Sequence, residues 1–213
     1  MKTRVVSNID EIYFTSDLHL QHANIIELCD RPYSSLEEMN KALISNWNNT
    51  IKHGDWVYIL GDFCWGDRKM WVYFLHQLPG NKILIQGNHD KDNNIPRDMF
   101  VDVIDGFLNM EIKDPDIQSK SQRLTLCHYP MLSWYQSHKG AWQLFGHWHT
   151  LATQKPQVNR VKEGESDYIR EEFILMDRVR RSQWDVGVDL NNYTPISYQQ
   201  IKKIMTKNLE ISK

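Results

Sequence analysis

Three apolar segments of this chain end in the same way, with a glycine followed directly by a polar residue. They read DWVYILGD at residues 55–62, KILIQGN at 82–88 and AWQLFGH at 141–147. A continuous apolar run of this length, closed by a turn residue, is typical of a strand that is buried on both faces of a sheet. Such a sheet needs further layers above and below it, so this feature predicts a layered α/β domain.

The rest of the chain supplies the strands and helices that such a domain requires. We expect strands at 11–17, 122–130 and 184–192, one or two strands at 99–112, and helices at 22–29, 34–51, 67–81 and 197–210. The second helix has the clearest signal, because Ser35 and Glu38 have the spacing of a capping box. Its apolar residues then recur on one face at helical spacing: Leu36, Met39, Leu43, Trp47 and Ile51.

Length and charge narrow the class of protein further. A chain of 213 residues suits one domain over residues 1–213, with a highly charged insertion at about 151–183. The formal net charge is −2 and the basic residues are scattered, so the sequence lacks the basic patch that is typical of proteins that bind duplex nucleic acid. No apolar run approaches the ~20 residues of a membrane span. The first residues lack the pattern of a secretory signal and the three cysteines lack paired spacing, so we expect a cytoplasmic protein with reduced thiols.

The polar residues at the strand ends form the candidate site. In an α/β sheet, the carboxyl ends of the strands border the crevice in which ligands bind. A single polar residue there is usually a cap or a loop residue, but five strand ends carry one or more in this chain. Converging carboxylates and imidazoles are costly to bury unless a cation pairs with them, so the pattern predicts a metal site. The residues are Asp17, His19, Asp62, Asn88, His89, Asp90, His128, His147 and His149.

The order of these motifs resembles that of the calcineurin-like metallophosphoesterase superfamily. The string is D-x-H, G-D, G-N-H-D, a lone histidine and G-H-x-H, within residues 11–149. The later segment WDVGVDLNNYTPIS also resembles the closing strand of small bacterial and phage members. The resemblance implies a four-layer αββα sandwich, in which helices flank two mixed β-sheets.

The resemblance also implies a dinuclear centre in which Asp62 bridges two divalent ions. One ion would be held by Asp17, His19, Asp62 and His149, and the other by Asp62, Asn88, His128 and His147. Imidazole and carboxylate ligands without thiolate favour Mn, Fe, Zn, Ni or Co, with Mn favoured in vitro. A metal-bridging hydroxide would attack phosphorus while His89 acts as general acid, and Asp90 would support the turn or the imidazole.

We therefore expect a dinuclear metal-dependent phosphoesterase that hydrolyses a small or nucleotide-type phosphodiester. A phosphomonoesterase or nucleotidase is the alternative. A catalytically silent scaffold for protein binding is less favoured, because all seven ligand positions and His89 are present. Asn88, His22 and Arg31 are candidates for binding the phosphate of the substrate.

Trp65 marks a departure from the related protein serine/threonine phosphatases. Those proteins have an aspartate at this position that supports the catalytic histidine. The residue that orients His89 is therefore left open, and a phosphoprotein substrate is less favoured. Four aromatic residues flank the motifs, and the sequence allows them either to pack in the core or to stack on a nucleobase: Trp65, Tyr129, Trp134 and Trp148.

Overall fold

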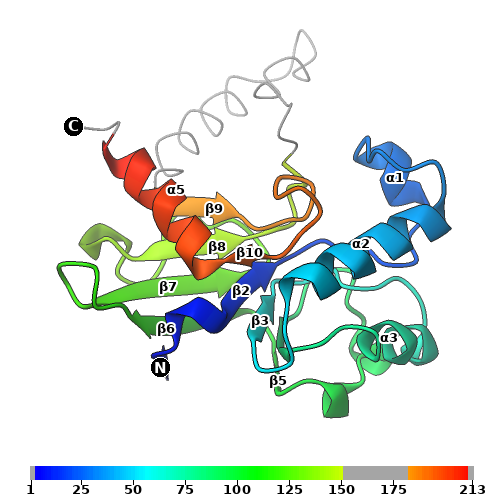
Figure 1. Ribbon diagram of the computed structural model, residues 1–213, viewed down its shortest axis with the longest axis horizontal. Helices are drawn as coiled ribbons and strands as arrows, with labels where there is room; N and C mark the ends of the chain where they lie inside the picture. Colours follow the sequence, from blue (N-terminus) through cyan, green and yellow to red (C-terminus); the bar gives the residue numbers. More distant parts are fainter. Residues whose placement is uncertain (1–2, 151–181, 211–213) are drawn as a thin grey trace, which may run out of the picture.

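The computed structural model describes residues 3–150 and 182–210 (Figure 1). The charged insertion expected at about 151–183 lies outside the described residues except for its last two. One of these, Gln183, begins a β-strand and is buried, so the sheet resumes before the expected boundary. None of the helices in these two described ranges has the length and hydrophobicity to cross a membrane.

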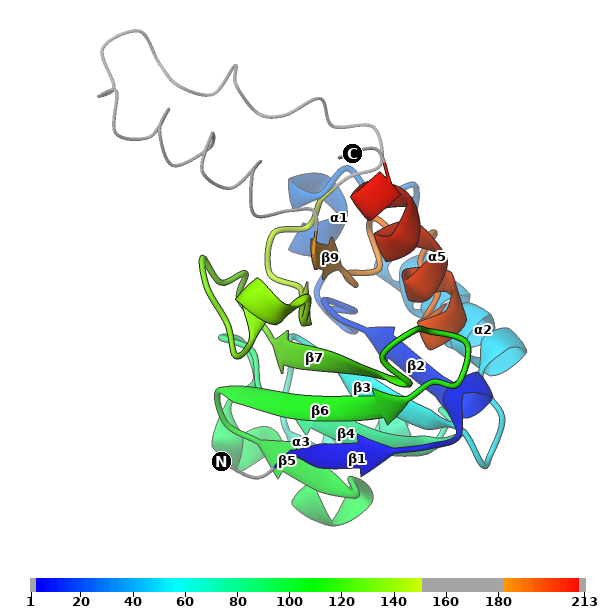
Figure 2. The same ribbon diagram turned by 90° about the vertical axis from the view of Figure 1, so that its left-hand side faces the viewer.

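Two mixed five-stranded sheets form the centre of the molecule, as predicted. One has the strand order β10 (Ile196–Ser197), β2 (Ile12–Thr15), β3 (Trp56–Ile59), β4 (Asn81–Ile85) and β5 (Asp102–Ile104). The other has the order β1 (Arg4–Val6), β6 (Phe107–Lys113), β7 (Ser121–Cys127), β8 (Trp142–Phe145) and β9 (Gln183–Asp185). Figure 2 shows β1, β6 and β7 stacked in front of β2, β3 and β4. Antiparallel pairing occurs between β10 and β2 and between β6 and β7, and the remaining neighbours run parallel.

The described α-helices are α1 (Asn24–Leu28), α2 (Leu36–Thr50), α3 (Arg68–Leu75) and α5 (Tyr198–Glu210). Short 3-10 helices cover Ile9–Glu11, Asp92–Asn94, Arg97–Met99 and Ser137–Lys139. The expected cap of α2 is present, because the hydroxyl of Ser35 accepts the backbone N–H of Glu38 at 3.2 Å. Helices α1, α2 and α3 pack on the outer face of the β2–β5 sheet, whereas α5 lies against β2, β9 and β10.

Two apolar cores hold these layers together. The first lies between the helices and the β2–β5 sheet, and its largest members, Trp47 and Trp71, are only 0% and 1% exposed. The Nε1–H of Trp47 donates to the carbonyl of Pro79 at 3.0 Å, so its polar atom is paired. The second core lies between the two sheets, where the rings of Phe14 and Tyr58 stack with centroids 5.6 Å apart. The cores therefore give the loops at the strand ends a rigid base.

The carboxyl ends of β2, β3, β4, β7 and β8 meet at one end of this sandwich. Backbone hydrogen bonds join the loops that leave them. The N–H of Asp17 donates to Gly61 at 3.0 Å, and the N–H of Gly146 donates to His128 at 2.9 Å. The segment after β9 joins the same cluster, because the N–H of Val188 donates to Ser16 at 3.1 Å. Loops from both sheets are thereby brought to one place.

Candidate metal centre

Strained backbone holds most of the expected ligands in place. Asp17, His19, Asp62, His147 and His149 all have positive φ, between 47° and 71°. Residues with a Cβ adopt this left-handed region rarely, at a cost on the order of 1–3 kcal/mol each. Strain of this kind clusters at functional sites, where the surrounding structure holds side chains in directions that regular strands cannot give.

Gly61 shows why glycine precedes a polar strand end. Its φ is 91°, and a Cβ there would lie 2.6 Å from both the Cα of Gly87 and the Nδ1 of His128. The loops after β3, β4 and β7 therefore approach one another more closely than any side chain at this position would allow. This close approach brings Asp62 next to His128.

A first cluster of donor atoms consists of Asp17, His19 and His149, whose candidate ligand atoms all lie within 4.8 Å of one another. Asp17 Oδ1 and His19 Nε2 are buried and have no hydrogen-bond partner in the part of the chain that the structure describes. His149 Nε2 lies 3.8 Å from Asp17 Oδ1, too far for a hydrogen bond. Burial raises the pKa of Asp17 to about 8. A cation at this place would pair with the buried lone pairs.

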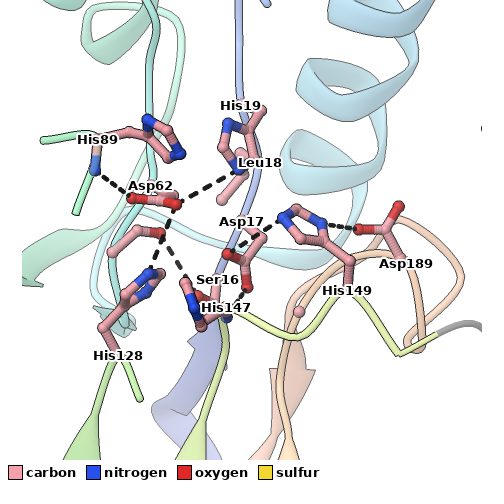
Figure 3. Close-up of polar contacts among 12 residues, drawn as sticks. Ser16, Asp17, Leu18, His19, Asp62, His89, His128, His147, His149 and Asp189 are labelled. Atoms are coloured by element: carbon pink, nitrogen blue, oxygen red, sulfur yellow. Dashed lines mark hydrogen bonds and ion pairs between the residues drawn. The ribbon is translucent and has the colours of Figure 1, made fainter. Parts of the chain in front are cut away.

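A second cluster consists of Asp62, His128 and His147, also within 4.8 Å (Figure 3). His128 Nδ1 lies 2.7 Å from the carbonyl of Leu60, so Nδ1 carries the hydrogen and donates it. Burial lowers the pKa of His128, which keeps the ring neutral and leaves a lone pair on Nε2. That atom faces the side-chain oxygen of Asn88 at 2.8 Å. Two acceptors this close repel each other unless a cation lies between them, so this cluster also fits a metal ion.

Asp62 connects the two clusters. Its Oδ2 atom lies 3.5 Å from His19 Nε2 on one side and 3.5 Å from His128 Nε2 on the other. A carboxylate between two sets of donors suits a bridging ligand. The donors are imidazole, carboxylate and amide atoms, which suit borderline divalent ions better than calcium.

Asp189 is a buried member of the site that the sequence analysis missed. Its carboxylate accepts a hydrogen bond from His149 Nδ1 at 2.8 Å, which leaves Nε2 of His149 directed at Asp17 (Figure 3). The hydrogen bond to Asp189 raises the pKa of His149 to about 11, although burial acts in the opposite direction. Asp189 follows β9 in the WDVGVDLNN segment, but its pairing with a histidine forty positions earlier leaves no local signal.

Arg31 does not lie where a phosphate clamp would lie. Its side chain is fully buried and pairs with Asp189 at 2.8 Å and 3.0 Å. Its remaining donors bond to the backbone carbonyls of Asp17 and Leu18, at 2.7 Å and 3.0 Å, and to the sulfur of Met39 at 3.5 Å. Contact with a substrate would break these bonds, so the expected phosphate contact is corrected to a support beneath the first cluster.

Asp90 supports the turns around the site. Its Oδ2 accepts the backbone N–H groups of Asp62 and Gly87, each at 2.9 Å, and its Oδ1 accepts that of Phe63 at 3.0 Å. These bonds tie the loop after β3 to the loop after β4. Of the two roles that the sequence left open for Asp90, the structure favours support of the turn over contact with the imidazole of His89.

His89 is exposed and stands beside the clusters. Its backbone N–H donates to Asp62 Oδ1 at 2.9 Å, and its ring centroid lies 5.5 Å from that of His19. His22 is half-buried between His19 and Trp65, with its Nδ1 3.3 Å from His19 Nδ1. The ring of His22 stacks on that of Trp65 at 4.4 Å with an interplanar angle of 10°. His22 and His89 are thus both close to the open side of the site.

The fold and the donor set define a metal-dependent phosphoesterase, and comparison with known proteins identifies the family. The chain matches the model of the calcineurin-like phosphoesterases over residues 11–176, and it belongs to that family. It is therefore a phosphate-ester hydrolase.

Relatives resemble the chain over most or part of its length. The uncharacterized protein MJ1445 of Methanocaldococcus jannaschii is 34% identical over 199 residues, which is 92% of each chain. The Gene 66 protein of Mycobacterium phage L5 is 36% identical over 89 residues, 40% of this chain and 42% of the phage protein. The crystal structure of AQ665 from Aquifex aeolicus, a protein of unknown function, has a TM-score of 0.62 and 26% identity, covering 91% of this chain and 98% of that one.

Proposed function

We propose that this protein hydrolyses a phosphodiester at a dinuclear centre. One ion would be held by Asp17, His19, Asp62 and His149, and the other by Asp62, Asn88, His128 and His147. The observation that carries the proposal is the set of ligand atoms that face one another across the two clusters. They include the buried, unpartnered atoms Asp17 Oδ1 and His19 Nε2 and the facing pair of His128 Nε2 and the Asn88 side-chain oxygen. When bound, two divalent ions lower the pKa of a water molecule and offset charge that develops on the phosphate.

The side chains of the protein contribute positioning and proton transfer. One carboxylate oxygen of Asp62 accepts a hydrogen bond from the backbone N–H of His89, and this bond fixes the distance between His89 and the clusters. His89 is exposed and next to the clusters, which suits a general acid that protonates the departing oxygen. Asn88 and His22, on the open side of the site, are candidates to bind the phosphate oxygens.

Aromatic side chains on two sides of the site support a diester over a monoester. Trp65 lies beside His89 with ring centroids 5.3 Å apart, and Tyr129 lies beside His147 at 4.7 Å. Both aromatic residues are exposed, at 42% and 45%. A diester has a substituent on each side of phosphorus and could contact both rings, whereas a monoester has only one.

A panel of substrates and two variants test this function. With Mn²⁺, we expect faster turnover of bis(p-nitrophenyl) phosphate than of p-nitrophenyl phosphate, and loss of both activities with a chelator. The reverse preference would support the phosphomonoesterase or nucleotidase alternative, and no activity on either would support a scaffold.

The variants His89→Ala and Asp62→Asn separate the proposed roles. His89→Ala should lower turnover by ~10²–10⁴-fold at unchanged metal content, because His89 donates a proton and binds no ion. Asp62→Asn should remove metal and activity together. Elemental analysis of the purified variants measures this difference, and equal metal loss in both would contradict the assignment.

The remaining expectations are part of the same proposal. We propose one domain over residues 1–213, with Mn²⁺ as an effective ion in vitro. Cys29, Cys64 and Cys127 are free and buried, which supports reduced thiols and a cytoplasmic location. Burial raises the pKa of Cys64, which argues against a nucleophilic role for this thiol.

A further inference from the structure

A cavity of about 230 Å³ lies beside His89, outside the two donor clusters. It is smaller than the ~300–1,000 Å³ that is usual for a drug-sized ligand, so it suits a single ring system with a short substituent. Its lining residues are Trp65, Gly66, Asp67, His89, Lys91 and Asn94.

Trp65 gives this cavity a rigid aromatic wall. The stacked ring of His22 supports the indole, while 42% of Trp65 remains exposed. The backbone of the same residue is fixed, because its N–H donates to the carbonyl of Leu20 at 2.7 Å. A wall that is already ordered loses little conformational entropy when a ring binds to it.

Polar groups at the cavity complement the aromatic wall. Lys91 and Asp67 are both exposed, and they offer a donor and an acceptor to the edge of a bound ring. Asn94 is tied to the cavity by a hydrogen bond from its Nδ2 to the carbonyl of Gly66 at 2.8 Å. A flat ring with polar edges fits this combination better than an aliphatic chain does.

We propose that this cavity binds the leaving group of the substrate, and that this group carries a nucleobase that stacks on Trp65. The inference rests on the proposed function, in which His89 protonates the departing oxygen. During hydrolysis a new P–O bond forms to the oxygen of water and the P–O bond to the leaving group breaks. The departing oxygen takes the proton of His89, and a proton from the attacking water replaces it. That oxygen must therefore lie within hydrogen-bond reach of His89, so its substituent lies in the cavity that His89 lines.

Two substrates with the same retained group test the cavity. Methyl p-nitrophenyl phosphate has an aromatic leaving group, and methyl 2,2,2-trifluoroethyl phosphate has an aliphatic one. Loss of stacking on an aromatic side chain weakens binding of a base by a factor of about 5 to 150. Trp65→Ala should therefore lower kcat/KM for the aromatic substrate by about that factor. The same variant should lower kcat/KM for the aliphatic substrate by a clearly smaller factor, and Trp65→Phe should recover most of the loss on the aromatic substrate.

Inhibition by thymidine tests the nucleobase directly. Thymidine should inhibit the wild-type protein competitively, and its inhibition constant should rise about tenfold or more in Trp65→Ala. Tyr73→Ala is the matched control, because Tyr73 is 58% exposed on α3 and does not line the cavity. It should change neither measurement.

The outcomes separate this inference from the proposed function. If Trp65→Ala lowers kcat/KM equally for both substrates, or for neither, the cavity does not bind the leaving group. Hydrolysis by the wild type that a chelator abolishes would still support the proposed function. If Trp65→Ala lowers kcat/KM only for the aromatic substrate but thymidine does not inhibit the wild type, the proposal that the leaving group carries a nucleobase is wrong. A wild-type protein inactive on both substrates would overturn the function, and the inference with it.

Discussion

Replacing Asp189 by asparagine measures how far the candidate centre depends on a carboxylate that is not itself a proposed ligand. The Asp189 carboxylate accepts a hydrogen bond from His149 at 2.8 Å and pairs with Arg31 at 2.8 Å and 3.0 Å. Asparagine keeps the size of the side chain and one carbonyl oxygen but removes the charge. Loss of such a partner behind a metal-binding histidine typically lowers metal affinity by ~10–100-fold, which corresponds to ~1.4–2.8 kcal/mol.

The same change also lowers stability. It leaves the buried guanidinium of Arg31 without its counter-charge, and breaking a buried ion pair costs about 3–5 kcal/mol. We expect the lower end of this range, because Arg31 keeps its bonds to the backbone carbonyls of Asp17 and Leu18. Since domains are typically stable by ~5–15 kcal/mol, the variant should still fold, and urea denaturation followed by circular dichroism checks this first.

Equilibrium dialysis against increasing Mn²⁺ then measures the metal affinity. The wild type should take up two ions per chain. Asp189→Asn should fill the Asp62, Asn88, His128 and His147 site normally and need about 10–100-fold more Mn²⁺ for the other. A folded variant that fills both sites at wild-type concentrations would refute the role of Asp189 in orienting His149. Equal weakening of both sites would show a general loss of structure instead.

Asp98→Asn is the matched control for this experiment. It also removes a carboxylate from an arginine, since Asp98 pairs with Arg68 at 2.6 Å, but the Asp98 side chain is 74% exposed. Exposed ion pairs contribute about 0–1 kcal/mol, so both stability and metal uptake should stay close to wild type.

Two further predictions concern pH and the core. Affinity for Mn²⁺ should rise with pH from about pH 6, because the ion must displace protons from two ligands: burial raises the pKa of Asp17 to about 8, and the hydrogen bond to Asp189 raises that of His149 to about 11. Calorimetric titration in buffers of different ionisation enthalpy measures the released protons, and a pH-independent affinity would contradict the argument. Trp47→Ala should lower the free energy of unfolding by about 3–5 kcal/mol, because the fully buried indole leaves a cavity and an unpaired carbonyl on Pro79. Urea denaturation measures this loss, and a change below about 1 kcal/mol would show that the core repacks.

Local patterns were sufficient to predict the main elements of the fold. The strands β2, β3, β4, β7 and β8 and the four described α-helices follow from apolar periodicity and from caps such as that of Ser35. The sequence predicted either one strand or two in the segment 99–112. The structure has two, β5 and β6, which lie in different sheets. Strands β1 and β10 were missed, because three and two residues are too few to form a pattern.

The expected ligands were predictable for a related reason. Each follows an apolar strand directly, and parallel strands of an α/β sheet bring their carboxyl ends to one edge. Asp17 and Asp62 could therefore be expected to meet from their positions alone, because they follow neighbouring parallel strands, whereas His128 follows a strand of the other sheet. The contacts that support them could not be predicted, because Asp189 and Arg31 are separated by 158 positions and each would pass for an ordinary surface residue in its own segment.

The sequence by itself therefore determined which strands form and which side chains stand at their ends, because burial and turn formation depend on neighbouring residues. Only the tertiary structure decided which of these side chains gather into the candidate metal clusters, which are buried supports and which remain exposed. Arg31 became a buried partner of Asp189, and Trp65 became the wall of a cavity beside His89. These outcomes depend on the desolvation and distance of groups far apart in the chain, and only packing of the two sheets sets both quantities.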